Sequence, residues 1–132
     1  MIVDSSAVLA VLLRQPGHEL VLGALVSDDA LGIGAPTLAE SGIVLSARIG
    51  VTGRTLLYRF VEEANIQVVP FEEVHWDVAV DAFSRFGKGR HPAALNFGDC
   101  LTYAVASLAD EPLLCLGDDF SRTDLTVLPE RA

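Results

Sequence analysis

The chain has 132 residues, of which 51% are hydrophobic, a usual size and composition for one globular domain. This excludes an intrinsically disordered protein, because disordered segments lack the apolar residues that a core requires. The formal net charge is −9, so the surface as a whole repels nucleic acid and suits a basic partner. We therefore expect one domain over residues 1–132.

Short apolar runs alternate with longer helical patterns along the chain. In chain order we predict a strand at 1–4, helices at 5–17 and 18–28, a strand at 30–35, helices at 36–50 and 52–65, a strand at 66–70, a helix at 71–87, a loop at 88–97, a helix at 98–110, and strands at 112–117 and 125–129. This alternation predicts an α/β fold with a mostly parallel sheet between two helical layers. The strands are almost wholly apolar, as expected for a sheet that is covered on both faces.

The chain opens on MIVD, which has no basic segment before its apolar residues and does not resemble a secretory signal. No apolar stretch approaches the roughly 20 residues that span a bilayer. We expect a cytoplasmic protein with no membrane association. Cys100 and Cys115 lie within apolar runs and are expected as buried thiols, with a disulfide as the alternative.

Acidic residues recur where strands end and helices begin. Asp4 ends the first strand, Glu40 lies in the first turns of the helix at 36–50, and Asp99 lies in the first turn of a later helix. Asp118 and Asp119 directly follow the strand LLCLG. In a parallel sheet these positions share one edge, where sites of open α/β sheets form. We therefore expect the acids to converge.

A cluster of carboxylates is unstable alone, because like charges raise each other's pKa values. Mg²⁺ or Mn²⁺ removes the repulsion and prefers oxygen ligands. Such a metal site can activate water and stabilise the oxygens of a phosphodiester during cleavage. Each acid also has an ordinary structural interpretation, as a helix cap, a first-turn acid or a turn former.

Four segments carry a resemblance to a known family: MIVDSSAVLAVL, PTLAES with Glu40, LNFGDCLTYAVA with Asp99, and LLCLGDDFSRTDL. The whole chain resembles PIN-domain ribonucleases, specifically the VapC-type toxins of VapBC toxin–antitoxin pairs. The resemblance implies an α/β/α sandwich and Mg²⁺- or Mn²⁺-dependent RNA cleavage. It also implies a toxin homodimer and a small, basic VapB-like antitoxin.

The family's first three acids correspond to Asp4, Glu40 and Asp99, which the resemblance makes catalytic residues and metal ligands. The fourth acid is Asp118 or Asp119, because the doubled aspartate leaves the alignment ambiguous by one residue. Asp118 is the position taken as a metal ligand, and both aspartates are catalytic candidates.

Five further residues are candidates for RNA binding. Ser6 corresponds to the family's small hydroxyl residue, which contacts either the first acid or a phosphate, and Asn96 is a polar residue close to Asp99. Arg85, Lys88 and Arg90 form a basic island in an acidic chain. That island is interpreted either as a phosphate-binding surface or as a solvated loop.

The helices at 36–50 and 52–65 carry more large apolar residues than one sheet face absorbs, which predicts an antitoxin-binding surface beside the acids. Two other interpretations remain: a catalytically degenerate PIN domain, and a receiver-like acidic metal-binding module that acts by protein binding. A dehalogenase-like phosphatase requires a second aspartate two residues after Asp4, where Ser6 stands.

Overall fold

Five parallel strands form the central sheet of the computed structural model, which describes residues 1–28 and 30–130. The strands are β1 (Ile2–Val3), β2 (Leu31–Gly34), β3 (Ile66–Val69), β4 (Leu113–Leu114) and β5 (Val127–Leu128). Their order is β3-β2-β1-β4-β5, and all four pairings are parallel. The predicted α/β class and parallel sheet are confirmed, whereas the predicted domain limit at residue 132 lies outside the described residues.

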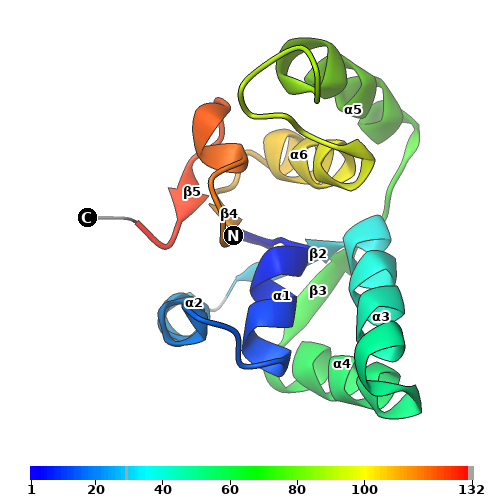
Figure 1. Cartoon of the computed structure of the whole chain (residues 1–132), viewed down its shortest axis with the longest axis vertical. Helices are drawn as coiled ribbons and strands as arrows, with labels where there is room; N and C mark the ends of the chain where they lie inside the picture. The colour runs from blue at the N-terminus through cyan, green and yellow to red at the C-terminus, as the bar shows by residue number, and fades with distance from the viewer. Residues whose placement is uncertain (29, 131–132) are drawn as a thin grey trace.

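Six helices cover the two faces of this sheet (Figure 1). They are α1 (Ser5–Leu12), α2 (His18–Ser27), α3 (Ala35–Ile49), α4 (Val51–Glu63), α5 (Glu73–Phe86) and α6 (Phe97–Ala109). Alternate strand residues point to opposite faces, so Ile2 packs in the core beneath α5 and α6, whereas Val3 packs in the core of α1 to α4. The described part of the chain has no helix that is long and apolar enough to cross a membrane.

The helices differ from their predicted ranges by one or two residues at most ends, and two of the differences have a clear backbone cause. The first helix ends at Leu12 instead of residue 17, because Arg14 has a φ of 50° and Gln15 precedes a proline, a position that disfavours helix. The helix predicted from residue 52 begins at Val51 after Gly50, whose φ is 72°. Gly53, in the first turn of α4, is buried, and a Cβ there would lie 2.7 Å from the Leu45 backbone. Gly53 therefore lets α3 and α4 approach closely.

The strand order places a topological switch at β1. From β1 the chain moves outward to β2 and β3, and it returns to the other side of β1 with β4 and β5. The first residue after β1 is Asp4, whose backbone N–H donates to the Leu114 carbonyl at 2.9 Å. Crevices of open parallel sheets form at the carboxyl ends of strands that flank such a switch. Asp4 lies at this point.

Candidate functional site

Asp4 is a buried carboxylate at the junction of β1 and α1, with 4% of its surface exposed. It is the N-cap of α1, since its Oδ2 accepts from the Ser6 backbone N–H at 3.1 Å. The same oxygen accepts from the Ser6 hydroxyl at 2.6 Å, and that hydroxyl accepts from the Leu116 N–H at 3.0 Å. Ser6 therefore fixes Asp4 and ties the start of α1 to the chain that follows β4.

Two buried threonines complete the surroundings of Asp4. The Thr102 hydroxyl hydrogen-bonds the Asp4 carboxylate, and it lies 2.8 Å from the hydroxyl of Thr37. Burial raises the pKa of Asp4, and hydrogen bonds from Ser6, the Ser5 backbone and Thr102 oppose that rise. Neither threonine was singled out in the sequence. The only signal was their spacing, three residues after Asp99 and three before Glu40.

Asp99 lies in the first turn of α6 and is half-buried. Asn96 is the N-cap: its Oδ1 accepts from the Asp99 N–H at 2.9 Å, and Asp99 Oδ2 accepts from the Asn96 N–H at 3.1 Å. Burial raises the pKa of Asp99 to about 6, with further contributions from the charges of Asp4, Asp119 and Glu40. Three other carboxylates therefore act on Asp99, each from a different segment.

Glu40 reaches this group from α3. A Cβ added at Gly98 would lie 2.8 Å from Glu40 Oε2, so the carboxylate lies against the backbone at the start of α6. Glu40 and Asp119 are both exposed. The charge of Asp119 is among those that raise the pKa of Asp99. Asp118 and Asp119 both stay candidates for the fourth acid.

The donor chemistry of this group suits Mg²⁺ or Mn²⁺, since every charged member is a carboxylate and the pKa of Asp99 is raised by the others. Within residues 1–28 and 30–130, no three His, Cys, Asp or Glu side chains form a ready-made metal-binding cluster. The charges of Asp4, Asp119 and Glu40 nevertheless raise the pKa of Asp99, and a bound cation would relieve this repulsion.

The predicted basic island divides into two parts. Arg85, at the end of α5, donates to Asp124 Oδ2 at 3.1 Å and lies 3.6 Å from Asp81. Lys88 and Arg90 lie in the following loop and are exposed, with the Arg90 guanidinium 5.8 Å from the centroid of the Phe83 ring. Arg85 therefore contacts carboxylates, whereas Lys88 and Arg90 lie exposed in the loop. RNA binding by these three residues stays a prediction.

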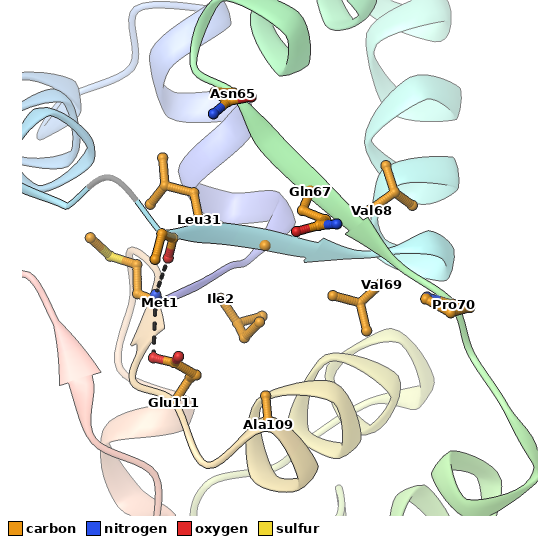
Figure 2. A pocket seen from close by; sticks show the side chains of 12 residues that line it. Met1, Ile2, Leu31, Asn65, Gln67, Val68, Val69, Pro70, Ala109 and Glu111 are labelled. Atoms are coloured by element: carbon orange, nitrogen blue, oxygen red, sulfur yellow. Dashed lines mark hydrogen bonds and ion pairs between the residues drawn. The ribbon is translucent and has the colours of Figure 1, made fainter.

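A hollow of about 710 Å³ lies elsewhere in the structure. Figure 2 shows it along β2 and β3, with the side chains of Gln67 and Val69 on its wall and the Met1 amino group directed to Glu111. That amino group lies 3.4 Å from Glu111 Oε2 and donates to the Ala30 carbonyl at 2.7 Å. None of the five candidate acids lines this hollow, so it is not the candidate catalytic site.

Comparison with known proteins decides the family. The PIN domain model matches residues 1–125. The chain belongs to the PIN-domain family. Within that family it is 48% identical over 126 residues to ribonuclease VapC36 of Mycobacterium tuberculosis, a match that covers 95% of this chain and 91% of that protein. The predicted resemblance to VapC-type PIN ribonucleases is therefore confirmed.

Solved structures of other proteins have the same fold. The crystal structure of Mycobacterium tuberculosis VapC20, a sarcin–ricin loop cleaving toxin, superimposes with a TM-score of 0.79 at 16% identity and covers 95% of both chains. A toxin–antitoxin complex from Klebsiella pneumoniae superimposes with a TM-score of 0.73 at 14% identity, covering 99% of this chain and 98% of that one. At these identities the likeness concerns the fold alone.

Proposed function

We propose that this chain is a Mg²⁺- or Mn²⁺-dependent endoribonuclease that acts as the toxin of a VapBC-type toxin–antitoxin pair. The observation that carries the proposal is the group of acids around Asp99, whose pKa is raised to about 6 in part by Asp4, Asp119 and Glu40. Strongly perturbed carboxylates at a sheet switch point mark a candidate catalytic site. The 48% identity to a named ribonuclease supports the same function.

In this proposal Asp4, Glu40, Asp99 and Asp119 hold the cation, with Asp118 as the alternative fourth ligand. When bound, the cation supplies Lewis-acid activation of water and charge stabilisation at the phosphodiester. Ser6 and Thr102 orient Asp4 through their hydroxyl hydrogen bonds. Because Asp4 is buried and Asp99 is half-buried, both carboxylates work in a region where electrostatic interactions are stronger than in water.

An RNA cleavage assay with the purified chain tests this function. Cleavage is expected with Mg²⁺ or Mn²⁺ and is expected to stop when EDTA is added. Cleavage that persists in EDTA would contradict the metal site. A chain that binds Mn²⁺ but cleaves no RNA would favour the degenerate PIN alternative, in which the domain acts only by protein binding.

Gly98→Ala tests the contact between Glu40 and the start of α6. The added Cβ would displace the Glu40 carboxylate, which is the mobile end of its side chain. We expect the free energy of unfolding to stay equal or rise by up to about 1 kcal/mol, because Ala is a better helix former than Gly. Cleavage is expected to fall by about 10-fold or more, as for other disturbances of ligand orientation.

Gly23→Ala is the matched control for that variant. Gly23 lies inside α2, and a Cβ there meets nothing within 4 Å. It is expected to stabilise the fold in the same way while leaving cleavage unchanged. Equal cleavage by both variants would show that the position of Glu40 is unimportant.

The loop after α5 is proposed to bind RNA phosphates through Lys88 and Arg90. Replacing both residues with Ala is expected to weaken single-stranded RNA binding and to reduce the slope of log K against log salt by about 0.7 for each lost contact. Fluorescence titration at several salt concentrations measures this slope. Arg14→Ala, which removes an exposed arginine from another surface, is the control. An unchanged slope would show that this loop is a solvated surface loop that does not bind RNA phosphates.

The antitoxin is proposed to bind the groove between α3 and α4. This groove has a volume of about 660 Å³ and is lined by apolar residues that include Leu57 and Ile43. A second hollow of about 410 Å³ shares Ile43 and leads to Glu40 and Gly98. A basic, partly apolar antitoxin segment fits this path, because an Arg or Lys at its end would neutralise the carboxylates. Substrate-binding roles for Ser6 and Asn96, a toxin homodimer and a cytoplasmic location also remain proposals. For Arg85, RNA binding is the alternative to the role that its pairing with Asp124 indicates.

A further inference from the structure

The chain between β4 and β5 carries Asp119. Hydrogen bonds to Asp124, further along the same segment, connect it to α5 and α6. Tyr103 Oη donates to Asp124 Oδ1 at 2.6 Å. Arg85 donates to Asp124 Oδ2 at 3.1 Å and to Tyr103 Oη at 3.3 Å. Three side chains from α5, α6 and the β4–β5 connection thus form one closed hydrogen-bonded group, which we call the Asp124 clamp.

The clamp and the candidate site lie on the same face of α6. Asp99 and Tyr103 are four residues apart on that helix, a spacing that puts side chains on one face. Asp119 acts on Asp99 and Asp124 binds Tyr103, so the connection follows the helix face for one turn. Phe120, the residue after Asp119, is buried with 3% of its surface exposed, so the segment is anchored next to Asp119 as well as at Asp124.

The Asp124 clamp ties this segment to α5 and α6 through side chains, since Asp124 accepts hydrogen bonds from both Arg85 and Tyr103. Burial acts to raise the pKa of Asp124, but the hydrogen bonds from Tyr103 and Arg85 outweigh it and the pKa is lowered. Arg85 and Asp124 are about half-exposed at 46% and 54%, and such surface ion pairs add little to overall stability. The effect of the clamp is therefore expected on the local register of the segment more than on folding.

We infer that Asp124, Tyr103 and Arg85 are positioning residues that hold the β4–β5 connection in the register that presents Asp119 to Asp99. The inference rests on the proposed metal-dependent function. It assigns Arg85 to this clamp instead of to RNA phosphates. None of the three residues touches the reacting atoms.

Two variants test the clamp independently of activity. Asp124→Ala removes the central acceptor, and Tyr103→Phe removes one hydroxyl while keeping the buried ring, so that folding is preserved. Amide hydrogen exchange of the metal-free protein is expected to rise over residues 118–124 in both variants. Asp81→Asn, which removes only the 3.6 Å partner of Arg85 on α5, is the control and is expected to leave this exchange unchanged.

Metal titration distinguishes positioning from a purely structural role. The Mn²⁺ dissociation constant of the full chain is expected to rise by about 10-fold in Asp124→Ala and Tyr103→Phe, without additivity in the double variant. RNA cleavage at saturating Mn²⁺ and the KM for RNA are expected to stay near the wild-type values, and Asp124→Asn, which keeps one acceptor, should recover part of the Mn²⁺ affinity. Asp81→Asn should bind Mn²⁺ like the wild type.

Wild-type Mn²⁺ affinity in both clamp variants would overturn the inference while leaving the proposed function intact. A higher KM for RNA in Arg85→Lys at unchanged Mn²⁺ affinity would overturn it in favour of phosphate binding. If the wild-type chain itself neither binds Mn²⁺ nor cleaves RNA, the proposed function fails and the positioning role fails with it.

Discussion

Asp99→Asn is expected to reduce RNA cleavage by about 1,000-fold or more, the largest effect of any single substitution considered. The change removes one ligand charge from the centre of the acidic group, where Asp4, Glu40 and Asp119 all act on Asp99. Asn retains a side-chain oxygen that can accept from the Asn96 N–H, so the start of α6 is preserved. Single-turnover cleavage over a range of Mn²⁺ concentrations measures the loss.

Asp110→Asn is the matched control, because Asp110 follows the opposite end of α6 and is exposed. It is expected to cleave RNA at the wild-type rate. Asp4→Asn should behave like Asp99→Asn, since Asn also serves as an N-cap and the same cation is lost. Full EDTA-sensitive activity in either site variant would show that the metal ligands have been wrongly assigned.

Asp99→Asn should also raise the free energy of unfolding of the metal-free protein. Because the folded pKa of Asp99 is about 6, above the ordinary value of 3.8, the fold favours the protonated acid. Wild-type stability is therefore expected to fall as pH rises from about 4 to about 6 and to stay lower above that range. After allowance for solvent screening, the loss is about 1–2 kcal/mol. Denaturant unfolding of the wild type and of Asp99→Asn at pH 4.5 and 7.5 measures this loss. An equal pH dependence of stability in the two proteins would show that Asp99 is not its cause.

Strand ends and acids could be predicted from sequence because both are local signals. Asp4 directly follows a short apolar run, as the pair Asp118 and Asp119 follows another, and the parallel sheet brings the ends of both runs to one edge. Glu40 and Asp99 were placed by the helix starts that precede them. Helix limits set by proline and glycine were less certain, since Gly53 proved to be a packing position inside α4.

The sequence could not predict which side chains far apart along the chain form hydrogen bonds with each other. Thr37 and Thr102 are 65 residues apart and look like ordinary helix residues until the fold joins their hydroxyls. Arg85 lies in a basic stretch of sequence, yet its partner Asp124 is 39 residues away. Local charge pattern suggested phosphate binding, whereas tertiary contacts pair this arginine with carboxylates. Such pairings depend on the relative placement of whole elements, which no local pattern contains.

Ile43→Asn is expected to weaken antitoxin binding by about 100-fold, the second largest effect, which corresponds to about 2.8 kcal/mol. Ile43 lies where the α3/α4 groove meets the hollow beside Glu40. Its side chain is 71% exposed, so the substitution removes apolar contact area from the partner without opening the core. Binding to the proposed antitoxin, measured by titration calorimetry, gives the affinity.

Val51→Asn makes the same kind of change outside the groove and is the control for that prediction. Val51 begins α4, is 90% exposed, and lines neither hollow. It should bind the antitoxin with wild-type affinity. Both variants should cleave free RNA normally, because neither residue is a proposed ligand. Inhibition by the antitoxin should then be lost only in Ile43→Asn. Equal antitoxin affinities of Ile43→Asn and Val51→Asn would indicate that the antitoxin binds another surface. The catalytic proposal would be unaffected.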